Sequence, residues 1–174
     1  FVTLPGTASE RNPFGVLGLT FACDLSALYA GTVIGSTPTS AQGGVVVIET
    51  DGQIRGVALA DTDVMGVLVV RVAGGYELYA GLARSPQIVA VPLDARGLAT
   101  GPARSLIDLT AAGAAPSERA RKLRMLAGAL TVDLVPFNFS LQGSASAQAQ
   151  TRRATWRYDL ARSVWVVSQA AAGA

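Results

Sequence analysis

The sequence contains no histidine and a single cysteine, Cys23, among its 174 residues. Histidine is the usual base of serine and cysteine triads and a common zinc ligand, so its absence excludes these sites in their usual forms within this chain. A lone cysteine cannot form an internal disulfide or a Cys-x-x-Cys metal site. We expect Cys23 to be a buried thiol.

Charge and long apolar runs are also scarce. Only 15% of the residues are charged and the net charge is +2, which is too small to indicate binding to nucleic acid and leaves membrane contact open. The longest apolar run, Phe14 to Cys23, is interrupted by glycine and threonine, so no segment reaches the ~18 residues of a membrane span. Half of the residues are hydrophobic, enough for one folded domain over residues 1–174.

Carboxylates remain as possible catalytic or metal-binding groups, but they are scattered. The close acidic groups are "ETD" (Glu49 to Asp51) and "DTD" (Asp61 to Asp63). Such groups can cleave glycosidic bonds or bind calcium. We interpret Asp51 as a turn residue and place Asp61 and Asp63 in a connecting loop. We therefore predict no enzyme activity, no cofactor, no metal and no cleft lined by an acid pair ~5–9.5 Å apart.

Most of the chain has the pattern of β-strands joined by tight turns. The run Gly44 to Thr50 is continuously apolar, as in a strand buried on both faces. Asp51-Gly52 follows it and predicts a type I′ hairpin, with a return strand over Ile54 to Ala60. Three more hairpins are predicted, with turns at residues 73–75, 94–97 and 159–162. One segment, Pro116 to Gly128, is a helix candidate whose second half is equally compatible with a strand.

The tetrapeptide Leu-Tyr-Ala-Gly occurs twice, ending at Gly31 and at Gly81, and a weaker copy, "MLAG", ends at Gly128. Self-similarity at this spacing indicates a repeat architecture. We parse three units of four short strands, at about residues 15–60, 64–108 and 121–169. The predicted strands of the units lie at 15–22, 27–34, 44–50 and 54–60, then 64–72, 76–83, 87–93 and 97–108, then 121–127, 130–139, 151–158 and 163–169. Residues 170–174 are predicted to form a flexible tail.

The segments "GGVVVIETDGQ" and "SPQIVAVPLDARG" resemble strand passages of the YVTN and NHL-like β-propellers of bacterial surface and periplasmic proteins. The resemblance covers about a third of the chain and implies a shape rather than an activity. Propellers typically have four to eight blades, whereas three units are present here. An all-β fold of three four-stranded antiparallel meanders is therefore predicted, propeller-like, with a β-sandwich of ten to twelve strands as the alternative.

Two long irregular segments are the candidate binding loops, because long insertions in repeat proteins usually gather on one face. The first, residues 35–43, contains Thr37 and Pro38, and the second, residues 135–151, contains Phe137, Asn138 and Phe139. We predict these five residues as ligand-binding or partner-binding positions. Disordered spacers are the alternative for both segments.

Arginines cluster in two places, and both clusters have a structural interpretation. "RARKLR" (Arg119 to Arg124) could bind phosphate groups, but we interpret it as a solvated face beside Glu118. In "RRATWRY" (Arg152 to Tyr158), strand alternation places the aromatic side chains on one face and two arginines on the other. A four-residue turn would then place Trp156 directly opposite Trp165.

Together these observations predict a non-enzymatic protein of the bacterial cell envelope or exterior that acts through protein–protein contacts in an assembly. A binding module for a small ligand or glycan is the alternative, and an acid-only glycoside hydrolase is the least favoured. Three meanders leave an incomplete ring with apolar edges, including "VLVVRV" and "SVWVVSQ". We therefore expect a protein partner or a second copy to complete it. Because residue 1 is Phe, removal of a signal segment and excision from a longer chain are both open.

Overall fold

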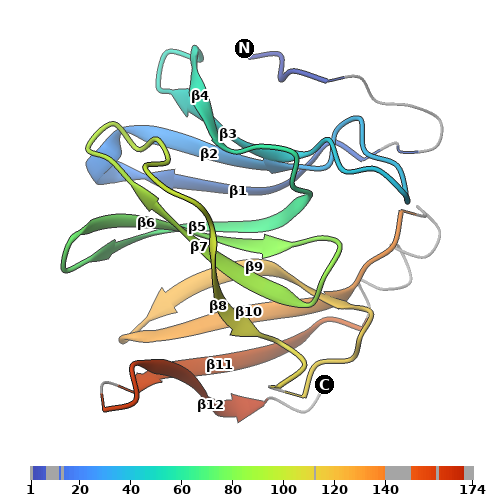
Figure 1. Ribbon diagram of the computed structural model, residues 1–174, viewed down its shortest axis with the longest axis vertical. Helices are drawn as coiled ribbons and strands as arrows, with labels where there is room; N and C mark the ends of the chain where they lie inside the picture. Colours follow the sequence, from blue (N-terminus) through green and yellow to red (C-terminus); the bar gives the residue numbers. More distant parts are fainter. Residues whose placement is uncertain are drawn as a thin grey trace.

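A computed structural model describes residues 2–6, 12, 14–111, 113–139, 150–159 and 161–170. The chain forms three four-stranded antiparallel sheets, each a meander of consecutive strands (Figure 1). This confirms the predicted fold class. In the described part of the chain, no helix is long and apolar enough to cross a membrane.

The strand boundaries follow the three predicted units closely. Sheet 1 contains β1 (Val16–Ala22), β2 (Ala27–Thr32), β3 (Gly44–Glu49) and β4 (Ile54–Leu59). Sheet 2 contains β5 (Val64–Val72), β6 (Gly75–Leu82), β7 (Gln87–Leu93) and β8 (Arg104–Asp108). Sheet 3 contains β9 (Glu118–Leu126), β10 (Ala129–Pro136), β11 (Arg152–Asp159) and β12 (Val164–Ala170).

The sheets are stacked in chain order, with sheet 2 in the middle (Figure 1). One core lies between sheets 1 and 2 and a second lies between sheets 2 and 3. The continuous apolar run in β3 explains how sheet 1 can pack on both of its faces. Val45 and Val47 face the first core, whereas Val46 and Ile48 face the outer side of sheet 1, and all four are buried. Face-to-face packing of successive sheets is compatible with both architectures considered from the sequence.

The repeated glycines allow one sheet to approach the next. A Cβ atom on Gly31 would lie 2.9 Å from a methyl carbon of Val64, and one on Gly81 would lie 2.4 Å from the carbonyl oxygen of Ala120. Both separations are too short for any side chain. Leu-Tyr-Ala-Gly therefore recurs because the second strand of sheets 1 and 2 must make the same close contact with the following sheet.

The third copy of this tetrapeptide was misplaced by the sequence interpretation. In each sheet the pairing of the first two strands shifts register once. The shift lies opposite Gly31 and Thr32 in sheet 1, opposite Gly81 and Leu82 in sheet 2, and opposite Asp133 and Leu134 in sheet 3. The counterpart of Leu-Tyr-Ala-Gly in sheet 3 is therefore residues 130–133, with Asp133 in place of glycine. Gly128 lies instead in the turn before β10, at a φ of 75°.

The helix candidate over Pro116 to Gly128 is not a helix, and the strand predicted at 121–127 is confirmed, because Glu118–Leu126 forms β9. Burial alternates at its start, where Glu118 and Ala120 are buried, and resumes at Leu123 after a register shift at Arg121. The last predicted strand of the second unit is also too long. Residues 98–103 form an irregular connection, and only Arg104–Asp108 form β8.

Two hairpins form with geometries that differ from the predictions. At Asp51-Gly52 only Gly52 has a positive φ, 89°, so the connection is a longer loop closed by a bond from Gly52 N–H to the Glu49 carbonyl rather than a type I′ turn. In the last hairpin Trp165 faces Tyr158, and Trp156 faces Val167. The two tryptophans share a face, as predicted, but they are not directly opposed.

Two smaller expectations also need correction. Cys23 is exposed, because it begins a short 3-10 turn, Cys23–Leu25, beyond the end of β1. Ala170, placed in the tail, ends β12. Residues 171–174 of the predicted tail lie outside the described residues, as do residues 140–149 of the second candidate loop.

Candidate functional site

The structure brings the five predicted binding residues together. Thr37 and Pro38 lie between β2 and β3, whereas Phe137, Asn138 and Phe139 follow β10. All five lie around Arg84, which follows β6. A shallow cavity of about 500 Å³ lies here. Its lining consists of Pro38, Ala83, Arg84, Arg119, Phe137, Asn138 and Phe139.

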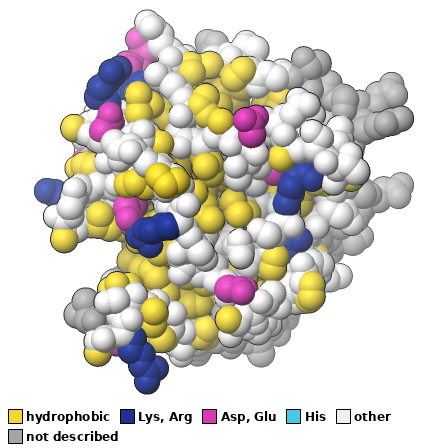
Figure 2. Space-filling view, viewed as in Figure 1, with side chains coloured by type: hydrophobic (Ala, Val, Ile, Leu, Met, Phe, Trp, Pro, Cys, Tyr) yellow, Lys and Arg dark blue, Asp and Glu magenta, His cyan; other side chains and the backbone are white. Residues whose placement is uncertain are grey.

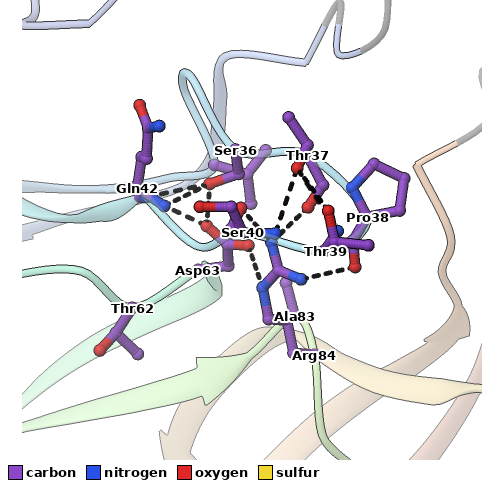
Figure 3. A network of polar contacts seen from close by, with 12 residues as sticks. Ser36, Thr37, Pro38, Thr39, Ser40, Gln42, Thr62, Asp63, Ala83 and Arg84 are labelled. Carbon is purple, nitrogen blue, oxygen red and sulfur yellow. Dashed lines mark hydrogen bonds and ion pairs between the residues drawn. The ribbon is translucent and has the colours of Figure 1, made fainter.

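Arg84 anchors the first candidate loop to sheet 2 (Figure 3). Its Nη1 donates to the carbonyl of Pro38 at 2.9 Å, and its Nη2 donates to the carbonyls of Thr37 and Ser40 at 2.5 and 2.6 Å. Its Nε lies 2.6 Å from Oδ2 of Asp63. Three hydrogen bonds from the guanidinium therefore hold the loop, and the contact between Nε and Asp63 adds an ion pair without hydrogen-bond geometry.

Asp63 forms the buried end of this network. Asp63 is 2% exposed. Its Oδ1 accepts hydrogen bonds from the Ser36 hydroxyl and from Gly43 N–H, the latter at 3.1 Å. The prediction that Asp63 lies in a connecting loop is confirmed, since it stands between β4 and β5. Its role as the acceptor that fixes residues 36–43 was not predicted.

Aromatic rings form the other wall of this loop cluster. Phe137 packs edge-on against Phe14 and Phe139, with ring centroids 5.5 and 5.4 Å apart. The Arg84 guanidinium lies 5.1 Å from the Phe139 ring. Because Arg84 already donates hydrogen bonds to backbone carbonyls, this surface exposes phenyl rings and backbone groups and does not form a binding site for an anion.

The predicted solvated face of "RARKLR" is wrong for Arg119, and the neighbouring Glu118 is buried. Arg119 donates to the carbonyls of Ala83 and Arg84, at 2.9 and 3.2 Å, and so ties sheet 3 to sheet 2. Glu118 is 6% exposed and accepts two hydrogen bonds from Arg152, at 2.6 and 2.7 Å. The hydrogen bond from Arg152 lowers the pKa of Glu118 below its usual range, although burial acts in the opposite direction.

A larger cleft, of about 1100 Å³, opens between the outer parts of sheets 2 and 3. Figure 2 shows a hollow lined by hydrophobic side chains on this side of the molecule. Its aromatic lining residues are Tyr79, Trp156, Tyr158 and Trp165. Trp165 makes edge-on contacts with Tyr79 and Tyr158, with ring centroids 6.4 and 5.5 Å apart. Burial raises the pKa of Tyr79 to about 12, so its hydroxyl keeps its proton at neutral pH.

The cleft also contains two carboxylates, which do not form a catalytic pair. Glu77 binds Arg104 through two contacts of 2.7 and 2.9 Å. Asp108 lies opposite Gln87 on β7, and Glu77 lies opposite Pro92, five residues further along that strand. Five residues of strand span roughly 16 Å, beyond the ~5–9.5 Å of glycosidase carboxylates.

The outer face of sheet 1 is apolar across all four strands. Two cross-strand rows lie on this face: Leu19, Ala30, Val46 and Val57, then Phe21, Leu28, Ile48 and Ile54. Val2 and Leu4 of the N-terminal segment pack against part of it. Four side chains remain exposed: Leu19 at 61%, Phe21 at 51%, Val57 at 48% and Ile54 at 42%.

The corresponding outer face of sheet 3 is charged. Asp133 lies between Arg124 and Arg153, at 3.1 and 2.8 Å. Burial tends to raise the pKa of Asp133, but the hydrogen bonds from the two arginines outweigh it and hold the pKa below its usual range. The next cross-strand row consists of Arg124, Thr131 and Thr155. The two ends of the stack are therefore chemically different.

Comparison with protein-family models found no match, and comparison with curated proteins likewise found no similar sequence. Among the described residues, no group of three or more acidic or cysteine side chains is placed to hold a metal ion. The function must therefore be inferred from the surfaces described above.

Sequence reasoning missed two of these surfaces. The cleft depends on Tyr79 lying across from the last hairpin. Tyr79 and Trp156 are 77 residues apart, and their strands belong to different sheets, so no motif or strand pairing connects them. A signal for the apolar outer face did exist: Leu19 and Phe21 alternate on β1, and Ile54 and Val57 follow a strand already apolar on both faces.

Proposed function

We propose that this protein is a non-enzymatic β-sheet protein that acts through protein–protein contacts, with the outer face of sheet 1 as its contact surface. The supporting observation is the set of four large apolar side chains left 42–61% exposed on one face: Leu19, Phe21, Ile54 and Val57. Isolated exposed apolar residues are ordinary, but a contiguous apolar patch on a folded protein usually marks an interaction site.

The partner proposed for this face is the same face of a second copy. Within each copy, sheet 1 packs its other face on an apolar face of sheet 2, so an apolar sheet is the kind of surface that fits. The charged outer face of sheet 3, with Asp133 between two arginines, does not match it. A ring closed head to tail by two copies would bury these charges against leucine and phenylalanine, at a large desolvation cost.

The dimensions of the face set the expected affinity. Four strands are roughly 19 Å across, and six residues along a strand span roughly 20 Å. Such an area, roughly 400 Å² per copy, lies below the ~1,200–2,000 Å² buried in total by stable interfaces and is typical of weak, transient contacts. We therefore expect dissociation constants in the micromolar range, so the assembly state should depend on protein concentration.

Size-exclusion chromatography with light scattering, from about 5 to 500 µM protein, tests this proposal. The unaltered chain should shift from 17.8 kDa towards twice that mass as concentration rises, and Leu19→Asp should abolish the shift. Leu126→Asp is the matched control, because Leu126 is 56% exposed on sheet 3 and its replacement should leave the shift intact. A monomer at every concentration, or equal effects of the two variants, would refute the proposal.

We also propose a finer architecture for the three sheets. The three sheets would be propeller-like blades, in which the first strands β1, β5 and β9 lie nearest a common axis. A cavity of about 540 Å³ between β1 and β9 supports this arrangement. The resemblance to bacterial surface propellers supports a location at the cell envelope or outside the cell. A small-ligand or glycan-binding role is the second candidate, and the cavity of about 500 Å³ beside Pro38 and Phe137 is the site proposed for it.

A further inference from the structure

The junction between sheets 1 and 2 shows how the fold fills the space over a core tyrosine. The Tyr29 hydroxyl donates a 2.9 Å hydrogen bond to the carbonyl of Gly97, in the connection between β7 and β8. Leu98 of the same connection lies directly over Gly56, where a Cβ atom would be 2.9 Å from its Cδ2. A short loop thus supplies one backbone carbonyl and one leucine side chain to this junction.

At the junction between sheets 2 and 3 the equivalent connection, between β11 and β12, is much shorter, and none of its described residues forms a hydrogen bond with the tyrosine there. Tyr79 is the counterpart of Tyr29 in the repeated tetrapeptide. Tyr79 as a whole is 4% exposed, and it lines the 1100 Å³ cleft. Its hydroxyl forms no hydrogen bond within the described part of the chain. This hydroxyl is not among the buried unpartnered atoms of the described residues, so it opens to the cleft and is available to donate a hydrogen bond to a ligand there.

The walls of the cleft have the chemistry of a peptide-binding site. The cleft runs along β8 and the start of β12, since residues 104–108 and 163–167 both line it. Among the described strands, each of these two ends its sheet and pairs on one side only, so each leaves backbone groups able to pair with an extended chain. The remaining lining is mostly apolar, with Val70, Met125 and Trp165 among its side chains.

We propose that this cleft binds a short apolar peptide segment of a partner protein in an extended conformation. One backbone carbonyl of the peptide accepts a hydrogen bond from Tyr79, and an apolar side chain packs against Trp165. The peptide then takes the place that residues 97 and 98 occupy at the first junction. This site is separate from the outer face of sheet 1 and does not depend on the dimer proposed above.

The observations favour a peptide over a glycan or an anion. A glycan would require several free polar groups, whereas the main charged pair at the cleft, Glu77 and Arg104, is already engaged through two contacts of 2.7 and 2.9 Å. Arg104 occupies the position on β8 that Gly56 occupies on β4. Each of the two pairs with the residue of the third strand that lies opposite the tyrosine of its sheet. Arg104 therefore narrows the cleft at one end and leaves the part beside β12 for the peptide.

Selection from a displayed library of random ten-residue peptides tests the proposal. The full chain is immobilised, enriched peptides are synthesised with a fluorescent label, and their dissociation constants are measured by fluorescence anisotropy. We expect enrichment of apolar peptides. Tyr79→Phe should weaken binding about fivefold, the usual effect of one lost hydrogen bond, and Trp165→Ala should weaken it more than about tenfold. Tyr158→Ala, at an exposed position, provides a second aromatic variant if Trp165→Ala does not fold.

Tyr29→Phe is the matched control, since it removes the equivalent hydroxyl from the junction that is already filled. It should lower the stability of the fold and leave the peptide dissociation constant unchanged, whereas Tyr79→Phe should do the reverse. Leu19→Asp should also leave peptide binding unchanged, which separates this proposal from the dimer. Failure to enrich any peptide, peptide binding that Tyr79→Phe and the aromatic variants leave within twofold, or binding to an arrayed glycan without peptide binding would overturn the proposal.

Discussion

Replacing Asp63 by asparagine should destabilise the fold strongly, although the side chain keeps its size. The carboxylate is buried, accepts hydrogen bonds from Ser36 and Gly43, and pairs with Arg84 at 2.6 Å. Asparagine removes the charge and turns one acceptor oxygen into a donor facing the guanidinium. Breaking a fully buried ion pair costs about 3–5 kcal/mol.

The expected cost here is at the lower end of that range. The Arg84 side chain is 30% exposed and keeps its three backbone carbonyl acceptors, so it is not left wholly unpaired. Hydrogen bonds to charged groups contribute about 1.5–3 kcal/mol each, and part of this is retained by the amide oxygen. We expect a loss of about 3 kcal/mol, which corresponds to a fall in Tm of roughly 6–12 °C for a chain of this size.

Urea unfolding followed by tryptophan fluorescence measures this loss, because Trp156 is 1% exposed in the folded state and becomes hydrated on unfolding. Asp61→Asn is the control from the same "DTD" motif. Asp61 is exposed with a φ of 49°, a conformation that asparagine tolerates well, so its unfolding free energy should change by less than about 0.5 kcal/mol. If the two variants were equally stable, the proposed anchoring role of Asp63 would be refuted.

Three further predictions concern packing, pH and thiol accessibility. Gly81→Ala should cost about 1–3 kcal/mol in urea unfolding through overpacking, whereas Gly74→Ala, with open space around its Cα, should cost less than about 1 kcal/mol. Because the pKa of Glu118 is lower in the folded state, the unfolded state binds more protons, so stability should fall as pH drops below about 4; Glu118→Gln should reduce that slope, and an unchanged slope would contradict the assignment. The exposed thiol of Cys23 should react with a thiol reagent in the native protein at the rate seen in urea, and protection in the native state would show that it is covered.

The strand layout could be predicted because it is local. Turn residues and β-branched runs lie next to each other in the sequence, and successive strands of a meander pair with their neighbours. The predicted segment Pro116 to Gly128 shows the limit of this reasoning. Its arginine-rich composition favours a helix in isolation, yet pairing with β10 and burial of Ala120 and Leu123 against sheet 2 decide for a strand.

The candidate site was predictable only in part, for the same reason. Irregular length identified the loops that carry Pro38 and Phe137, and the fold brings both loops to one place. The residues that join them, Asp63 and Arg84, have no local pattern that distinguishes them from other surface charges. Their pairing depends on how sheet 2 meets sheet 1, a tertiary contact that no short stretch of sequence encodes.

The charged outer face of sheet 3 gives the stack a polarity. In arrays of stacked repeats, a terminal unit with a polar outer surface stops further addition and keeps the array soluble. With Asp133 enclosed by two arginines, sheet 3 has the character of such a capping unit, whereas sheet 1 retains the adhesive surface of an internal one. Any lengthening of this architecture, by association or by gene duplication, would therefore be expected to proceed from the sheet 1 side, while the other end stays closed.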